Sequence, residues 1–236
     1  DFVGQMPADL IDSPPERQLG WLLGQAAYWP DIARGFNDSE REKYSRPSWH
    51  YIDGAWLRDS ANVQGNVYVN RPPAQEIQGV AGSAITSERD ADNVVTALDY
   101  TTRVLADGDA EPAQRAVALC WVLHLMGDIH QPLHSGSLYS AELFATGDRG
   151  GNAIRVGESN LHSVWDRAMR GADKQSRNLL YAATYEDLSG HESDWTLWLA
   201  ESRELLVPAV YDDALLAAIA SADSSGAERL SNQSLS

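Results

Sequence analysis

Hydrophobic positions follow one another almost without a break over residues 116–129, and the polar ones among them are His124 and Asp128. A helix advances about 100° per residue, so these two side chains, four apart, project from the same face. A helix this apolar is buried on most sides, which leaves an imidazole and a carboxylate in need of a partner. Pro132 lacks an N–H and would clash with the carbonyl of Asp128, which predicts that the helix ends or kinks there.

The pattern over the rest of the chain predicts a mainly α fold, a multi-helix bundle with long loops and little sheet. Periodic apolar positions bounded by capping residues, prolines and glycines predict helices. These cover residues 12–34 with an interruption or restart at 29–34, 87–106, a stretch from 112 onward, 160–170, 173–186, 193–206 and 212–222. Residues 49–53 are predicted to be extended or irregular, 58–86 a loop with one short hairpin, and 135–159 a long loop with a brief strand at 153–156.

Length and composition predict one domain without a membrane span. We expect a single domain at residues 1–222 and a frayed Ser-rich tail at 223–236. No apolar run approaches the roughly 20 residues of a transmembrane helix. The net charge of −16 argues against general electrostatic binding to nucleic acid or anionic membrane. It leaves nucleic acid open as a substrate, because bound cations can reverse the local charge of a site.

The four-residue spacing of His and Asp recurs at His162 and Asp166, in another predicted helix. The candidate metal ligands of the whole chain are Asp31, His50, His124, Asp128, His134, His162 and Asp166. Imidazole nitrogen and carboxylate oxygen together suit zinc, and mixed sites of this kind that keep room for water are typical of catalysis. For a lone His-x-x-x-Asp, the alternative is a core helix whose His and Asp hydrogen-bond to each other.

Five short motifs give the chain a family resemblance: WPDIAR, WHYID, HLMGDIHQPLH, GDRGGN and NLHSVWD, in this order. Together they resemble the zinc-dependent single-strand nucleases of fungi, plants and bacteria (nuclease S-one/P-one type), which share a fold with bacterial zinc phospholipase C. The resemblance spans residues from about 13 to about 206. It implies a catalytic domain that cuts single-stranded DNA or RNA to 5′-phosphate products and removes 3′-phosphates from nucleotides. It also implies a secreted or periplasmic protein, which we expect to be a monomer.

The resemblance assigns the candidate ligands to two zinc ions. The first ion would be held by Asp31, His50, His124 and Asp128, with Asp128 also bridging to a partner ion. The other ion would be held by His134, His162 and Asp166.

The resemblance also implies roles in catalysis and substrate binding. Arg34 and Asn152 match residues that contact the phosphate and stabilise its extra negative charge, while Asp128 would orient or deprotonate the attacking water. Tyr51 and Asp53 match the aromatic ring and the acid that stack against and hydrogen-bond a nucleobase.

One part of the family pattern is missing from the sequence. Relatives hold a third zinc ion with the bridging Asp, a His near the start and the amino and carbonyl groups of an N-terminal Trp. The chain begins DFVGQMPADLIDSPPE, without that Trp or His. We expect the mature chain to carry about six further residues that include them.

Two alternatives to a nuclease stay open at this point. A zinc phospholipase C would share the fold, although its last ligand is Glu where this chain has Asp166, and Tyr51 with Asp53 favours a base over a choline head group. A zinc-stabilised helical protein without catalysis would lose its fold in chelator yet cleave nothing.

Overall fold

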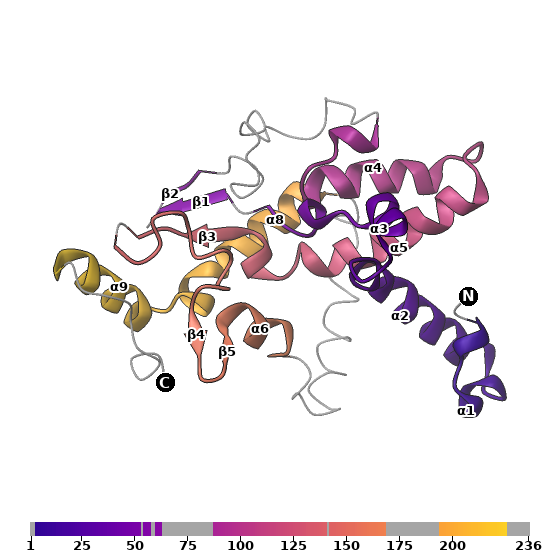
Figure 1. Ribbon diagram of the computed structural model, residues 1–236, viewed down its shortest axis with the longest axis horizontal. Coiled ribbons are helices and arrows are strands. Elements are labelled where there is room, and N and C mark those ends of the chain that lie inside the picture. The colour runs from indigo at the N-terminus through magenta and orange to yellow at the C-terminus, as the bar shows by residue number, and fades with distance from the viewer. Residues whose placement is uncertain are drawn as a thin grey trace. The chain divides into compact units, whose positions relative to one another are not determined.

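The computed structural model describes residues 3–52, 54–57, 60–62, 87–140, 142–168 and 194–225 (Figure 1). Two compact units divide the chain, unit 1 with residues 1–50 and 83–128 and unit 2 with residues 51–82 and 129–236. Helices dominate the described residues, which confirms the predicted mainly α fold. In this part of the chain no helix has both the length and the apolar character needed to cross a membrane. The predicted single domain and the helix predicted at 173–186 are not tested, the latter because it lies outside the described residues.

Unit 1 is a set of packed helices. Its elements are η1 (Val3–Gln5), α1 (Ala8–Ile11), α2 (Pro15–Ala33), α3 (Asp38–Tyr44), η2 (Pro47–His50), η4 (Glu88–Asp90), α4 (Val94–Ala106) and α5 (Pro112–Asp128). The α4 and α5 helices run side by side, and α2 packs against α5 (Figure 1). The apolar residues Val94, Leu98, Trp121 and Leu125 are buried where they meet. The end of α5 at Asp128 agrees with the boundary predicted from Pro132.

A buried tryptophan fixes the short η2 turn within unit 1. The indole N–H of Trp49 donates to the carbonyl oxygen of Ala91 at 2.8 Å. Its ring meets that of Trp121 edge-on, with centroids 4.8 Å apart. Since His50 follows Trp49 directly, these contacts hold His50 beside α5.

The predicted interruption near Pro30 is absent, because α2 continues through Pro30 to Ala33. Pro30 lies in the last turn of the helix and is buried. Its missing N–H removes one helical hydrogen bond, and burial of its ring offsets that loss.

The helix predicted from residue 87 begins later, at Val94. The side-chain oxygen of Asn93 accepts hydrogen bonds from the N–H groups of Val95 at 3.0 Å and Thr96 at 3.1 Å. Ser87 caps only the short η4 turn. The stronger cap therefore sets the helix start.

Unit 2 combines short strands with helices. Its described elements are β1 (Gly54–Leu57), β2 (Ser60–Asn62), η5 (Pro132–His134), β3 (Gly136–Leu138), β4 (Arg155–Val156), β5 (Ser159–Asn160), α6 (Leu161–Asp166), α8 (Trp195–Glu204), the π-helical η7 (Leu206–Val210) and α9 (Asp213–Ser225). The first sheet has the order β2-β1-β3, with β1 antiparallel to β2 and parallel to β3. The β4 and β5 strands form a separate antiparallel pair.

One strand prediction for unit 2 is confirmed and others are corrected. The brief strand predicted at 153–156 corresponds to β4. The β1 and β2 strands form a hairpin that begins at Gly54, before the loop predicted at 58–86, and most of that loop lies outside the described residues. The β3 strand lies in a stretch predicted to be loop, because its partner β1 is distant in sequence. The α6 helix ends at Asp166 rather than at residue 170, and α9 continues to Ser225, so the predicted tail begins inside a helix.

The segment that carries His134 is tied down from several sides within unit 2. The hydroxyl of Ser202 donates to the carbonyl oxygen of Ile129 at 2.6 Å, and Arg203 Nε donates to that of Ser135 at 2.9 Å, both from α8. The N–H of Ile52 donates to the carbonyl oxygen of His134 itself at 2.8 Å. These bonds fix the backbone of η5 and so limit where the His134 side chain can point.

Candidate metal centre

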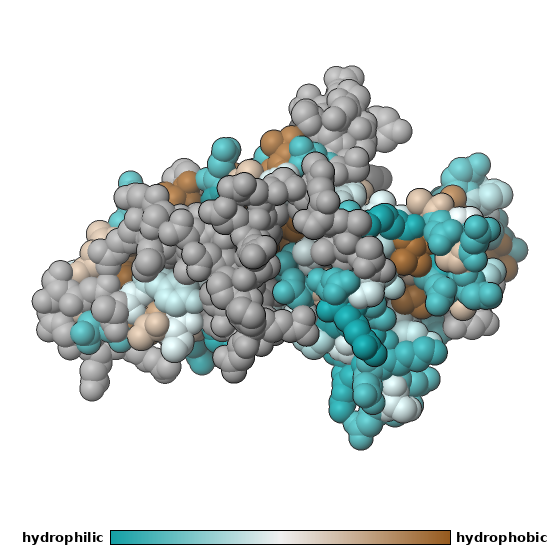
Figure 2. All heavy atoms as spheres, turned by 90° about the horizontal axis from the view of Figure 1, so that it is seen from above, coloured by the Kyte–Doolittle hydropathy of each residue, from teal (hydrophilic) through white to brown (hydrophobic). Residues whose placement is uncertain are grey.

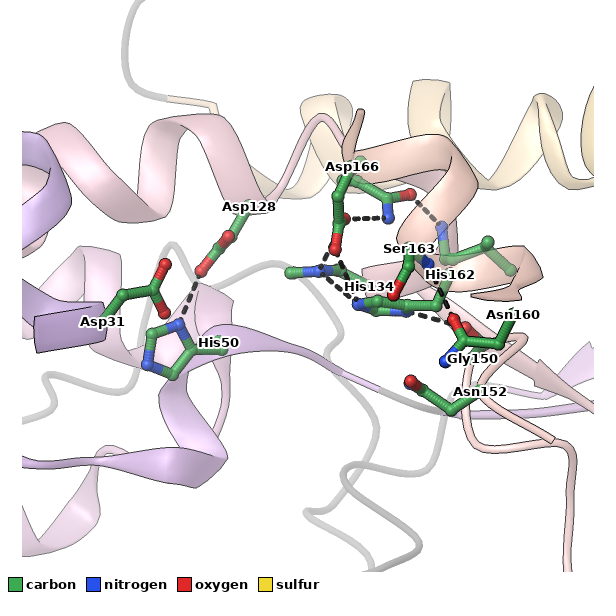
Figure 3. Close-up of polar contacts among 12 residues, drawn as sticks. Asp31, His50, Asp128, His134, Gly150, Asn152, Asn160, His162, Ser163 and Asp166 are labelled. Atoms are coloured by element: carbon green, nitrogen blue, oxygen red, sulfur yellow. Dashed lines mark hydrogen bonds and ion pairs between the residues drawn. The ribbon is translucent and has the colours of Figure 1, made fainter. Parts of the chain in front are cut away.

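Four predicted ligands meet in unit 1 and form what we call the Asp31 group: Asp31, His50, His124 and Asp128. Ligand atoms of the first three lie within 4.8 Å of one another. Figure 3 shows Asp128 pointing toward His50, and its Oδ2 lies 2.9 Å from His50 Nδ1 and 3.0 Å from His124 Nε2. The α2 helix supplies Asp31 from its last turn, η2 supplies His50, and the end of α5 supplies the other two.

The ring of His124 is oriented by a backbone carbonyl of α2. Its Nδ1 lies 2.8 Å from the carbonyl oxygen of Ala27, which can only accept a hydrogen bond. The proton is therefore on Nδ1, and Nε2 presents its lone pair 2.8 Å from His50 Nδ1. This is the arrangement by which proteins prepare a histidine to bind a metal.

The two imidazoles of the Asp31 group have opposite pKa shifts. Burial is the largest influence and lowers the pKa of His50, against the hydrogen bond and charge of Asp128. Burial also lowers the pKa of His124, but the combined effects of Asp128, Asp31 and the Ala27 carbonyl outweigh it and raise that pKa. The carboxylate of Asp128 is thus mostly buried beside two imidazoles, with the more exposed Asp31 nearby, and a divalent cation would compensate the two negative charges.

Three further predicted ligands meet in unit 2 and form the His134 group: His134, His162 and Asp166. Their ligand atoms also lie within 4.8 Å of one another. The two imidazoles stack, with Nε2 atoms 3.2 Å apart, and His162 Nε2 lies 3.6 Å from Asp166 Oδ2 (Figure 3). Nδ1 of His162 donates to the carbonyl oxygen of Gly150 at 2.8 Å, which again directs Nε2 into the group.

Both groups fit a zinc ion by the chemistry of their donors. Imidazole nitrogens and carboxylate oxygens converge without a thiolate, and the side chain of Asp166 is 43% exposed, so water can reach the His134 group. Two imidazole nitrogens that face each other beside a carboxylate require a proton or a cation between them. The described residues therefore provide two places that could hold a metal ion.

The predicted substrate residues are only partly described. Arg34 lies at the end of α2 with its Nη2 3.1 Å from Asp31 Oδ1, and its side chain is 52% exposed. Asn152 is exposed, and its Nδ2 donates to the carbonyl oxygen of Arg149 at 2.9 Å. Tyr51 is half-buried directly after His50, and Asp53 lies outside the described residues. The roles of these four residues stay predictions.

Sequence reasoning missed the groups that orient the ligands. Besides the carbonyls of Ala27 and Gly150, Gln131 donates from Nε2 to Asp166 Oδ1 at 2.9 Å and accepts from the N–H of Leu133 at 2.7 Å. Gln131 lies between the candidate ligands Asp128 and His134 in the sequence, and this position is the one signal that could have pointed to it. A backbone carbonyl acceptor cannot be predicted from the sequence, because every residue has a carbonyl group.

Comparison with known proteins gives consistent matches. A family model described as S1/P1 nuclease matches residues 16–223. Nuclease S1 of Aspergillus oryzae is 29% identical over 231 residues, which cover 86% of this chain and 69% of the relative. Endonuclease 3 of Arabidopsis thaliana is 51% identical over 162 residues, and the match covers 64% of this chain and 43% of the relative. Endonuclease 2 of the same plant is 36% identical over 108 residues, which cover 42% of this chain and 34% of the relative.

Proposed function

Because the chain belongs to the S1/P1 nuclease family, we propose that it is a zinc-dependent hydrolase that cleaves single-stranded DNA and RNA to 5′-phosphate products. Removal of 3′-phosphates from nucleotides would use the same site. The observation that carries the proposal is the assembly of the family-type ligands into the Asp31 group and the His134 group. The chain spans less than half the length of the plant relative Endonuclease 3. That this chain has the activity of a whole relative is therefore itself a proposal.

Zinc in the two groups would lower the pKa of bound water to about 7 and draw electron density from the phosphoryl oxygens. Asp128 is placed to accept a proton, because its Oδ2 lies among the ligand atoms of the Asp31 group, 2.9 Å from His50 Nδ1 and 3.0 Å from His124 Nε2. Asp128 would also bridge to a third ion. Residues 1–20 contain neither Trp nor His, so further ligands for that ion would have to come from outside this segment.

The charged and polar side chains around the groups would bind the substrate. Arg34 is half exposed while its guanidinium is held against Asp31, which leaves N–H donors for a non-bridging phosphate oxygen. The Asn152 amide would donate to a phosphate oxygen after leaving the carbonyl oxygen of Arg149. Stacking of an unpaired base on Tyr51, with Asp53 accepting from the base, would contribute about 1–3 kcal/mol and favour single strands.

Hydrolysis of single-stranded DNA with and without chelator tests the proposal. We expect 5′-phosphate ends, loss of cleavage in chelator and its return with zinc. Separate His124→Ala and His162→Ala variants should lower kcat/KM at least about 100-fold, since each loses one ligand. His130→Ala is the matched control, because His130 lies outside both groups and packs against Trp198.

Other outcomes would identify another class of protein. Undiminished cleavage in chelator would contradict a zinc mechanism. Hydrolysis of phosphatidylcholine without cleavage of DNA would indicate a phospholipase C. Zinc-dependent folding with cleavage of neither substrate would indicate a metal-stabilised protein without catalysis.

Localisation and oligomeric state are proposed from the family resemblance alone. We propose a secreted or periplasmic monomer. On the face shown in Figure 2 most of the described residues are hydrophilic, and the hydrophobic ones lie in separate areas. Sedimentation of the purified protein and cell fractionation would test both points.

A further inference from the structure

The carbonyl oxygen of Gly150 contributes to the orientation of His162. This oxygen lies 2.8 Å from Nδ1 of His162 and accepts its proton. A neutral imidazole protonated at Nδ1 has its lone pair on Nε2, which faces His134 and Asp166. If the carbonyl moved by about an ångström, His162 would lose both its tautomer preference and its direction.

The turn that carries this carbonyl has an unusual backbone. Gly147, Arg149, Gly150 and Gly151 all have positive φ, with values of 93°, 60°, 57° and 78°. Arg149 is the residue among them for which this region costs energy. A Cβ at Gly151 would lie 3.1 Å from the Leu133 side chain and 3.2 Å from the backbone N of His162. The turn therefore packs closely on α6 and needs side-chain hydrogen bonds to keep its shape.

Asp148 supplies those bonds from inside the turn. It is fully buried, and its Oδ1 accepts from the N–H of Leu138 at 2.9 Å while its Oδ2 accepts from the N–H of Gly151 at 3.0 Å. The hydroxyl of Ser137 accepts from the N–H of Gly150 at 2.9 Å. The N–H groups on the two sides of the Gly150 carbonyl, those of Gly150 and Gly151, are thus both hydrogen-bonded to buried side chains. These bonds fix the position of the carbonyl.

Tyr211 anchors Asp148 from the core of unit 2. The Tyr211 hydroxyl donates to Asp148 Oδ2 at 2.7 Å, and the whole side chain is buried. Its ring lies in the apolar cluster that includes Leu133, Leu138 and Leu206. The backbone N–H of Tyr211 donates to the carbonyl oxygen of Leu206, the first residue of the π-helical η7, so the tyrosine is held through both its backbone and its hydroxyl.

We propose that Asp148 and Tyr211 are positioning residues for the His134 group, acting through the Gly150 carbonyl on His162. Neither residue belongs to the His134 group itself. The inference rests on the proposed function in one respect, that the His134 group binds zinc. Hydrogen-bond partners of metal-binding histidines typically change metal affinity by 10- to 100-fold when they are lost.

The test uses the Asp31 group of the same molecule as an internal reference. Zinc or cobalt is titrated into metal-free protein in competition with a chelator, and the absorption spectrum of cobalt distinguishes ions by their ligands. In Tyr211→Phe, which keeps the ring and removes the hydroxyl, we expect the His134 group to bind about 10-fold or more weakly with a changed cobalt spectrum. The Asp31 group should keep its affinity.

Tyr100→Phe is the matched control, since it removes a hydroxyl from a half-buried tyrosine of unit 1. It should leave both affinities unchanged. A Tyr211→Phe protein that melts at a lower temperature but binds both ions as the wild type does would overturn the proposal, because the hydroxyl would then serve the core alone.

If Tyr211→Phe does not fold, Asp148→Asn decides the question, because an amide N–H then replaces one of the two carboxylate oxygens that accept from the N–H groups of Leu138 and Gly151. Selective weakening of the His134 group would support the proposal, and unchanged affinities would overturn it. Absence of metal binding to the wild type at both groups is a different result, since it would contradict the proposed function itself.

Discussion

Backbone carbonyls orient one histidine of each metal group. His124 donates to Ala27 and His162 donates to Gly150, both at 2.8 Å. A carbonyl fixes the tautomer without adding a further negative charge to a group that already contains carboxylates. A chain with a net charge of −16 gains from this choice, because each extra buried carboxylate would have to be compensated.

Gln131 joins the two ends of the His134 group. Its amide donates to Asp166 and its oxygen caps the η5 turn that carries His134. Gln131→Ala should therefore weaken zinc binding at the His134 group by about 10- to 100-fold. Competition titration would measure this, with Gln18→Ala as a control, because among the described residues the Gln18 amide donates to the backbone carbonyls of Ile11 and Ser13 in unit 1.

The buried carboxyl of Asp148 gives the protein a pH dependence. Burial raises its pKa from 3.8 to about 6, although the hydrogen bonds from Tyr211 and the backbone N–H groups lower it. Between these two pH values the folded state holds a proton that the unfolded state has lost. The group therefore adds stability as the pH falls through about 6 and costs stability above it.

Asp148→Asn removes this titration and makes it measurable. From pH 7 to pH 5 the unfolding free energy of the wild type should rise by about 1 kcal/mol relative to that of the variant. Urea unfolding of both proteins in chelator measures the difference between their unfolding free energies. The titrations of other groups contribute equally to both proteins and cancel in this difference. A difference that is independent of pH, or that changes in the opposite direction, would contradict the assignment.

At the scale of elements, caps set the helix boundaries of unit 1. The Asn93 cap of α4 is fully buried, whereas the Asn37 cap of α3 is exposed. Asn93→Ala should lower the unfolding free energy by about 2 kcal/mol, because the N–H groups of Val95 and Thr96 would be left unpaired away from water. Asn37→Ala should lower the unfolding free energy by only about 0.5–1 kcal/mol, because water can bind the N–H group that loses the exposed cap. Urea unfolding of the two variants compares them, and equal losses would show that burial of the cap has no effect.

The sequence predicted elements well where the signal is local. The apolar run up to Asp128 and the stop set by Pro132 place α5 correctly, and the four-residue spacing of His and Asp places one pair of ligands on each of α5 and α6. Elements that depend on distant partners were missed. The β3 strand exists because β1 pairs with it, and α2 passes through Pro30 because the ring is buried.

The candidate site shows the same difference between features with a local sequence signal and features that depend on residues distant in sequence. Residue types and motif spacing identified the candidate ligands that the structure brings together in each group, while their role as ligands stays a prediction. Their supports were not predictable, because Asp148 and Tyr211 meet across 63 residues of chain and neither belongs to a recognisable ligand pattern. Tertiary contacts of this kind appear only once the core of unit 2 is built.

At the scale of the whole molecule, charge governs the encounter with a polyanionic substrate. Many nucleic-acid-binding proteins depend on basic surfaces and lose affinity steeply as salt rises, but this chain has 34 acidic and 18 basic residues. Few phosphate contacts are therefore expected outside the site. The KM for single-stranded DNA should rise less than about tenfold between 50 and 200 mM salt. A steeper rise in steady-state assays would indicate an extended phosphate-binding surface.

The Asp31 group and the His134 group also differ in the length of chain that each must close. Each has a pair of ligands one helical turn apart, which a helix brings together by itself. The contact of His134 with His162 closes 28 residues, whereas that of His50 with Asp128 closes 78. By chain entropy the longer loop costs about 1 kcal/mol more to close. During refolding the His134 group can therefore assemble first, and an ion captured there would make unit 2 an early folding nucleus while the Asp31 group is still open.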